Sequence, residues 1–171
     1  MGGKTVWLVG MMGAGKSSVG PALAERLGVP FFDTDAEVER CAGTSVAALF
    51  AAEGEAAFRH RELEATRRLA GKPAVVALGG GALSEPRLRE VVAGGRRVYL
   101  RARPETLTDR LGAGEGRPLL TGLDGSGRLA RLGELLAARE TEYRRAELVI
   151  DTDGLALPEV VDAVARGLEG S

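Results

Sequence analysis

The stretch Gly10-Met11-Met12-Gly13-Ala14-Gly15-Lys16-Ser17 follows directly after the apolar run Val6–Val9 and decides the fold. It completes the pattern G-x-x-x-x-G-K-[ST], whose glycines let backbone N–H groups point at a phosphate while the next helix presents its positive N-terminus to the same anion. Lys16 is expected to reach the β- and γ-phosphates of a nucleoside triphosphate, and Ser17 to ligate magnesium. A glycine-rich turn without a ligand is the alternative, but the flanking strand and helix patterns favour phosphate binding.

Composition limits the class of protein and its partners. The 171 residues, 44% hydrophobic and 27% charged, predict one globular domain over 1–171. A net charge of −1 gives no global basic field for nucleic acid or an anionic membrane. The single Cys41 excludes an internal disulfide and indicates a reducing cytoplasm, and the first apolar run starts too close to Met1 for a signal peptide. We therefore expect a cytoplasmic monomer with no nucleic-acid or membrane partner.

Short apolar runs alternate with helical patterns along the chain, which predicts an α/β fold: a three-layer sandwich around a five-stranded parallel sheet. The expected strands are Thr5–Val9, Pro30–Phe32, Ala74–Leu78, Arg97–Leu100 and Glu147–Ile150. The expected helices are Lys16–Leu27, Asp35–Cys41, Val46–Ala52, Glu55–Ala70, Glu85–Ala93, Glu105–Leu111, Leu129–Arg144 and Glu159–Leu168, with Ser84 as a candidate cap. Ligands of such sheets bind at the carboxyl ends of the strands.

A long glycine-rich segment separates Leu111 from Leu129. Connections of this length without secondary structure are uncommon in packed domains unless they serve a function. We interpret residues from about 112 to about 127 as a mobile lid.

Two carboxylates, Asp33 and Asp35, stand at the end of the second expected strand. Their spacing places both side chains on the same side if the strand continues. One could serve the magnesium of a bound nucleotide while the other orients an acceptor hydroxyl and takes its proton. The alternative is that they cap the helix that starts near Ala36.

Two further features of the sequence could bind a ligand. Phe58 is expected to pack inward while Arg59 emerges in the first turns of a helix, where a cation opposes the helix dipole. A simply solvated arginine is the alternative. The run Gly79-Gly80-Gly81 directly follows a buried strand. It would let a ligand approach the backbone closely, although a tight loop that requires positive φ explains it equally well.

The ordered set of motifs resembles shikimate kinases over almost the whole chain. The matching segments are Gly10–Ser17, Asp33-Thr34-Asp35, Gly54-Glu55-x-x-Phe58-Arg59, Leu78–Gly81, Arg117-Pro118-Leu119-Leu120 and Arg139-x-x-x-Tyr143. Gluconate and adenylate kinases share only the phosphate loop and the general fold. The resemblance implies a P-loop kinase fold and ATP-dependent phosphorylation of the 3-hydroxyl of shikimate, on the route to chorismate and the aromatic amino acids.

The resemblance also implies roles for individual residues. Lys16, Asp35 and Arg117 would be catalytic: Asp35 would bind the substrate hydroxyls and take the proton, and Arg117 would come from the lid to the phosphates. Magnesium would involve Ser17 and, through water, Asp33. The nucleotide would be held by Gly13, Ala14, Gly15, Lys16, Ser17, Ser18, Arg110 and Arg117, with Arg110 stacked on adenine.

The shikimate carboxylate would lie between the forks of Arg59 and Arg139, which suit bidentate binding. The Gly80 N–H would donate to the substrate. The full expected set at shikimate is Asp35, Arg59, Gly79, Gly80, Gly81 and Arg139, with the helices of about 33–61 forming much of this part.

One segment departs from the family pattern. The loop 151–158 lacks the arginine that many relatives place against adenine, although Pro158 could supply the other face. His60 and Cys41 match no catalytic role. Two alternatives remain: another small-metabolite kinase, such as a gluconate kinase, or a non-catalytic nucleotide-binding regulator. Asp35, Arg59 and Arg139 together argue against a kinase of neutral sugars, because a neutral sugar would not need two carboxylate-binding arginines.

Overall fold

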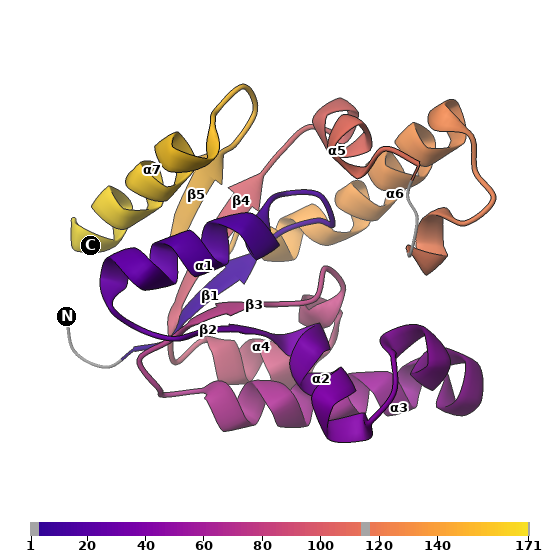
Figure 1. Ribbon diagram of the computed structural model, residues 1–171, viewed down its shortest axis with the longest axis horizontal. Coiled ribbons are helices and arrows are strands. Elements are labelled where there is room, and N and C mark those ends of the chain that lie inside the picture. Colours follow the sequence, from indigo (N-terminus) through magenta and orange to yellow (C-terminus); the bar gives the residue numbers. More distant parts are fainter. Residues whose placement is uncertain (1–3, 114–116, 171) are drawn as a thin grey trace.

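The computed structural model describes residues 4–113 and 117–170, and its centre is one parallel sheet in the strand order β2-β3-β1-β4-β5 (Figure 1). The strands are β1 (Val6–Val9), β2 (Phe31–Asp33), β3 (Val75–Ala77), β4 (Arg96–Arg101) and β5 (Leu148–Asp151). In the register of the sheet, Leu8 lies between Ala77 and Val98. The predicted α/β class with a five-stranded parallel sheet is confirmed.

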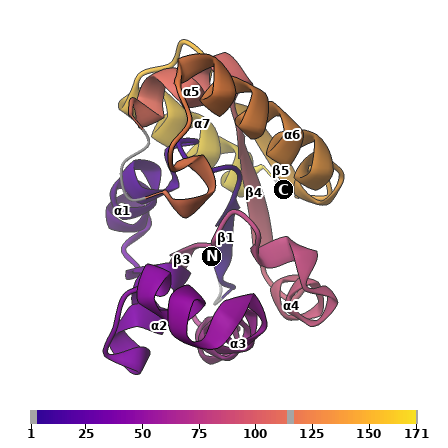
Figure 2. The ribbon, with the colours of Figure 1, turned by 90° about the vertical axis from the view of Figure 1, so that its right-hand side faces the viewer.

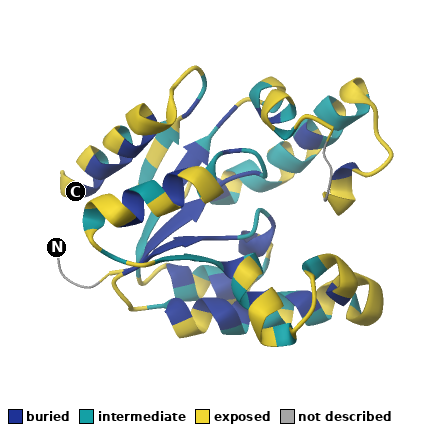
Figure 3. Ribbon diagram, in the orientation of Figure 1, coloured by how far each residue is buried: buried dark blue, intermediate teal, exposed yellow. Residues whose placement is uncertain are grey.

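The inner strands β1 and β3 are apolar along their whole length because helices cover both faces of the sheet. All residues of β1 and β3 are buried, and the dark blue strands at the centre of Figure 3 show this. The edge strand β5 alternates instead, with Val149 exposed between partly buried neighbours. This burial pattern places the core on both sides of β1, directly beneath the phosphate loop.

Helices form the two outer layers (Figure 2). Helices α1 and α7 pack against each other on one face, α4 and α6 lie on the other, and α3 runs beside α4. The α-helices are α1 (Lys16–Leu27), α2 (Thr34–Ala42), α3 (Val46–Leu69), α4 (Pro86–Val92), α5 (Pro104–Leu111), α6 (Gly125–Tyr143) and α7 (Leu157–Glu169). The short helices η1 (Ala82–Ser84) and η2 (Pro118–Leu120) complete the described elements. None of the helices in this described part is long and apolar enough to cross a membrane.

Several helix starts differ from the sequence prediction, and hydrogen bonds at α4 and α6 explain two of these differences. Glu85, not Ser84, caps α4, because its side chain accepts a hydrogen bond from the N–H of Arg87 at 3.2 Å. Helix α6 begins at Gly125 instead of Leu129, because the Asp124 side chain accepts from the N–H of Gly127 at 2.7 Å and so satisfies a free donor of the first turn. The expected lid therefore includes η2 and the first turn of α6. Residues 114–116 of the expected lid lie outside the described residues.

Helix α3 bends at Gly54, where φ is 83° and ψ is 176°, so the two helices predicted here meet end to end. Only glycine adopts this conformation readily. The bend lets α2 and the start of α3 fold over a small core of their own, made of Val38, Leu49, Phe58 and Ala65. This pair of helices extends past the sheet on the side where the strands end (Figure 1).

Candidate active site

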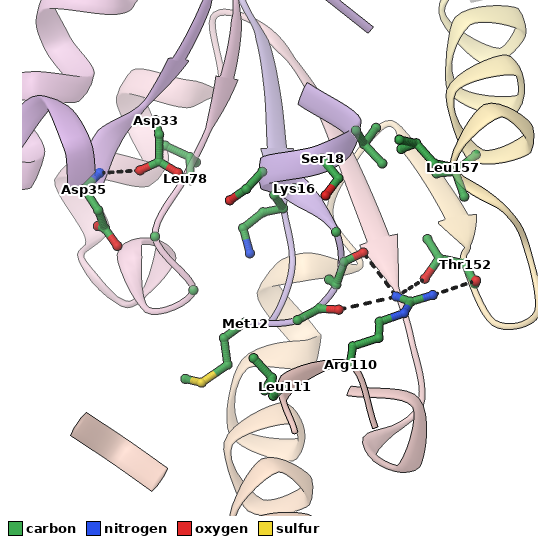
Figure 4. A pocket seen from close by; sticks show the side chains of 18 of the residues that line it. Met12, Lys16, Ser18, Asp33, Asp35, Leu78, Arg110, Leu111, Thr152 and Leu157 are labelled. Atoms are coloured by element: carbon green, nitrogen blue, oxygen red, sulfur yellow. Dashed lines mark hydrogen bonds between the residues drawn. The ribbon is translucent and has the colours of Figure 1, made fainter. Parts of the chain in front are cut away.

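A cavity of about 450 Å³ opens at the carboxyl ends of the strands, around the phosphate loop (Figure 4). Its walls come from the phosphate loop, the end of β2, the loop after β3, helix α5 and the segment after β5. The lining residues that the sequence predicted are Gly13, Ala14, Gly15, Lys16, Ser17, Ser18, Asp33, Asp35, Gly79, Gly80, Arg110 and Arg117. With Arg117, which directly precedes η2, the fold thus brings together groups from six separate segments.

The phosphate loop has the backbone that its glycines predict. Gly10, Gly13 and Gly15 have φ values of 146°, 81° and 100°. A Cβ at Gly10 would lie 2.6 Å from the carbonyl oxygen of Leu100, so space as well as φ demands glycine. Helix α1 starts immediately after Gly15, which directs its N-terminus at the cavity. This geometry fits an anion and argues against a turn with no ligand.

The Lys16 ammonium folds back over this loop. Nζ donates to the carbonyl oxygens of Gly10 at 2.7 Å and Met11 at 2.9 Å. Burial lowers the pKa of Lys16 to about 8, while the nearby Asp33 and Asp35 oppose that shift. A phosphate in the cavity would favour the charged form further, so the site is built to hold this cation against an anion.

Asp33 and Asp35 both line the cavity, but not in the way the strand pattern predicts. Strand β2 ends at Asp33, and Oδ1 of Asp33 accepts from the N–H groups of Asp35 at 2.9 Å and Ala36 at 3.2 Å. Asp33 is therefore the cap of α2, and Asp35 lies in the first turn of that helix. The expectation that a continued strand aligns the two was wrong, because the cap turns the chain directly after Asp33.

The Asp35 carboxyl has an oxygen that can accept a hydrogen bond from a ligand. Oδ1 of Asp35 is buried and has no hydrogen-bond partner among the described residues. Burial raises the pKa of this carboxyl, the charge of Asp33 raises it further, and Lys16 and Arg59 oppose the rise. A pKa closer to neutrality makes a carboxylate a better general base.

The triglycine loop Gly79–Gly81 is narrow because charged side chains crowd it. None of the three has a positive φ, so the tight-turn explanation fails. A Cβ at Gly79 would lie 2.5 Å from Oε1 of Glu62 and 3.1 Å from Oδ1 of Asp35. A Cβ at Gly81 would collide with Nη2 of Arg59 and lie 3.2 Å from Nη2 of Arg139. Glycine is needed here for close approach of these groups.

Arg59 and Arg139 converge on Gly81 from two helices, α3 and α6. They lie beside the loop and not in the lining of the cavity itself, and the same holds for Gly81. Nη1 of Arg59 donates to Oε2 of Glu62 at 2.6 Å, and Nη1 of Arg139 contacts Sδ of Met11 at 3.7 Å. Two guanidinium forks facing one short backbone segment form a candidate site for a carboxylate.

Glu62 is the main site residue that sequence reasoning missed. Its side chain is fully buried, and burial raises its pKa to about 7 although Arg59 lowers it. Oε1 of Glu62 is buried with no hydrogen-bond partner in the described part of the chain. Its position three residues after Arg59 on the same helix is the signal that could have revealed it.

The wall beyond the phosphate loop includes a second missed residue, Thr152. Nη1 of Arg110 donates to Oγ1 of Thr152 and Nη2 to its carbonyl oxygen, each at 3.0 Å, and the dashed lines in Figure 4 show these bonds. Arg110 also reaches the carbonyls of Gly13 and Ala14 at 3.4 Å. Leu155 and Leu157 continue this wall as an apolar surface. Arg110 therefore lies between the phosphate loop and the segment after β5.

The site combines a glycine loop shaped to bind an anion, the buried Lys16 ammonium, the Asp35 carboxyl with a buried oxygen, and the two convergent guanidinium groups of Arg59 and Arg139. A sequence model of the family described as shikimate kinase matches residues 12–169. The chain belongs to the shikimate kinase family. The resemblance found in the motifs is thereby confirmed over most of the length.

Individual relatives agree with this membership. A shikimate kinase of Symbiobacterium thermophilum is 49% identical over 168 residues, covering 95% of this chain and 94% of its own. The solved structure of the shikimate kinase of Acinetobacter baumannii in complex with shikimate is 35% identical, with a TM-score of 0.91, and the match covers 98% of this chain and 93% of that one. A gluconokinase from Sinorhizobium meliloti covers the same shares but matches with a TM-score of 0.63 at 25% identity.

Proposed function

We propose that this chain transfers the γ-phosphate of ATP to the 3-hydroxyl of shikimate, giving shikimate 3-phosphate and ADP on the route to chorismate and the aromatic amino acids. The observation that carries the proposal is the convergence of Arg59 and Arg139 on the triglycine loop, with Asp35 beside Gly79 in the lining of the cavity that the phosphate loop also lines. A small hydroxy acid fits this arrangement, because its carboxylate can bind the guanidinium groups of Arg59 and Arg139 while a hydroxyl binds Asp35.

Acceptor binding rests on two anchors at opposite ends of the small substrate. The carboxylate lies between Arg59 and Arg139, with the N–H groups of Gly80 and Gly81 as further donors. Planar forks bind a carboxylate bidentately, and two of them fix both position and angle. The hydroxyls then face Asp35, so the reacting oxygen is oriented before ATP reacts.

Phosphoryl transfer needs positioning and charge stabilisation more than covalent chemistry. A bond forms from the 3-hydroxyl oxygen to the γ-phosphorus, the bond from that phosphorus to the β–γ bridging oxygen breaks, and Asp35 takes the hydroxyl proton. Lys16 and Arg117 stabilise the negative charge on the transferring group. The loop residues Gly13, Ala14 and Gly15, with Ser17 and Ser18, hold the remaining phosphate oxygens.

Magnesium fits the donors at this site. Mg²⁺ prefers oxygen ligands and usually keeps several waters while it contacts one or two carboxylates and the phosphates of a substrate. The Ser17 hydroxyl and the Asp33 carboxylate line the same cavity, and one Asp33 oxygen is already committed to the cap of α2. We therefore assign Ser17 to the metal directly and Asp33 through water. Bound magnesium would neutralise charge on the β- and γ-phosphates.

The remaining expectations belong to this proposal. The chain acts as one domain over 1–171, as a monomer in the cytoplasm, with no nucleic-acid or membrane partner. Helices of about 33–61 hold shikimate, residues of about 112–127 form the lid that brings Arg117 to the phosphates, and Arg110 stacks on adenine.

A coupled assay of ADP release tests the proposal against its alternatives. With ATP and magnesium, shikimate should support turnover and gluconate should not, since gluconate lacks a rigid ring to span the distance from the forks to Asp35. Faster turnover of gluconate would favour the other small-metabolite kinase. ATP binding with no turnover of either compound would favour the regulator. A Lys16→Ala variant controls for a contaminating kinase, because it removes the phosphate cation.

A further inference from the structure

Tyr143, the last residue of α6, is 1% exposed and lies beside the triglycine loop. None of the roles proposed above involves it. Its hydroxyl donates a hydrogen bond to the carbonyl oxygen of Gly80 and lies 3.7 Å from Sδ of Met11. One polar atom therefore joins three segments: the end of α6, the triglycine loop and the phosphate loop.

The hydrogen bond to the Gly80 carbonyl restrains the backbone of the triglycine loop. This carbonyl belongs to the peptide that links Gly80 to Gly81, so fixing this oxygen also fixes the direction of the Gly81 N–H. Glycine has the largest backbone freedom of any residue, and three in succession need bonds from outside to hold one conformation. The Gly79 N–H donates to Oγ1 of Thr34 at 3.2 Å, and Ser84 Oγ donates to the Gly81 carbonyl at 2.6 Å. Tyr143 supplies the corresponding bond for the middle residue.

The same helix turn carries a substrate-binding arginine. Arg139 precedes Tyr143 by four residues, so the two side chains share one face of α6. Both contact the same atom, Sδ of Met11, at 3.7 Å. The phenol thereby sets how far the Gly80 peptide lies from the Arg139 fork. Burial raises the pKa of Tyr143 to about 12, so the hydroxyl keeps its proton as a donor at neutral pH.

We infer that Tyr143 is a positioning residue that holds the Gly80–Gly81 peptide at a fixed distance from Arg139, so that the shikimate carboxylate meets a preformed site. This inference rests on the proposed function. It assigns Tyr143 to shikimate binding and not to phosphoryl transfer. The Tyr143 hydroxyl is bound to the triglycine loop, and Tyr143 does not line the cavity around the phosphate loop.

Tyr99 provides a matched control. It lies on β4 with its ring centroid 5.1 Å from that of Tyr143, and it too is 1% exposed. Its hydroxyl is buried with no hydrogen-bond partner among residues 4–113 and 117–170. Tyr99→Phe and Tyr143→Phe therefore delete the same atom from neighbouring rings, and only the second deletion releases the Gly80 carbonyl.

The test compares steady-state kinetics of the two variants with shikimate and with ATP varied in turn. Tyr143→Phe should raise the KM for shikimate about 5- to 30-fold, the range for a lost hydrogen bond that leaves a carbonyl unpaired, with kcat and the KM for ATP changed less than about 2-fold. Tyr99→Phe should leave all three within about 2-fold. In the free proteins, the amide NMR signals of Gly80 and Gly81 should shift in Tyr143→Phe and stay in place in Tyr99→Phe.

An unchanged KM for shikimate in Tyr143→Phe would overturn the inference. An equal rise of this KM in both variants would also overturn it, because it would mean that only packing matters. Glycine signals that do not move in Tyr143→Phe would overturn it as well. This NMR comparison needs no substrate. It therefore still tests the positioning role if the unaltered protein fails to phosphorylate shikimate, an outcome that would refute the proposed function instead.

Discussion

Replacing Glu62 with glutamine should change how stability depends on pH. The Glu62 side chain is fully buried, and its pKa rises from an ordinary 4.5 to about 7, mainly because of burial. A carboxyl with a higher pKa in the folded state binds its proton more tightly there. Its stabilising contribution is therefore complete below pH 4.5 and is lost as the pH rises through 7. At about 1.4 kcal/mol per pKa unit, the loss amounts to roughly 3 kcal/mol.

Glutamine keeps the shape of the side chain and does not titrate. The free energy of unfolding of Glu62→Gln minus that of the unaltered protein should thus rise by up to roughly 3 kcal/mol as the pH increases from 4.5 to 8. Urea unfolding followed by circular dichroism at several pH values measures this difference. Glu55→Gln is the control, because Glu55 also pairs with Arg59, at 3.5 Å, but its side chain is 68% exposed. The difference in the free energy of unfolding between Glu55→Gln and the unaltered protein should stay nearly constant over this pH range.

A constant difference for Glu62→Gln over this pH range would refute the reasoning. A difference of opposite sign would also refute it. That result would show that the ion pair at 2.6 Å with Arg59 favours the carboxylate more strongly than burial disfavours it.

Four further substitutions test the site. Asp35→Asn should lower kcat at least about 10²-fold, the scale of a lost general base, while calorimetry still detects ATP binding; near-normal kcat would exclude Asp35 as the base. Arg59→Lys and Arg139→Lys should mainly raise the KM for shikimate, since an ammonium cannot replace a bidentate fork, and normal shikimate binding in both would disprove the carboxylate clamp. Gly81→Ala should weaken shikimate binding at least about 10-fold with little loss of thermal stability, because the new methyl group meets the movable end of Arg59; unaltered affinity would show that the loop tolerates a side chain.

The sheet and the phosphate loop could be predicted from the sequence because local patterns determine them. A continuous apolar run such as Val6–Val9 is typical of a strand covered on both faces, and the glycines of the loop have φ values that other residues avoid. Helix α1 has the predicted bounds, Lys16–Leu27. These features depend on neighbours in the chain and not on distant partners.

Two helix caps and two tertiary contacts were harder to predict. The sequence left open whether the strand continues past Asp33 or Asp33 caps α2, and three glycines near residue 125 obscured a helix start that Asp124 stabilises. Glu62 resembles any surface glutamate of a helix until the fold buries it against Arg59. Thr152 gains its role from Arg110, which is 42 residues away in the sequence.

Identification of the reaction product tests the central claim most directly. The protein is incubated with ATP, magnesium and shikimate, and the product is examined by correlated ³¹P and ¹H NMR. Transfer to the hydroxyl that faces Asp35 predicts a single phosphorylated product whose phosphorus couples to the proton on C3 of the shikimate ring. Coupling to the proton on another ring carbon, or release of ADP with inorganic phosphate and no phosphorylated shikimate, would contradict it.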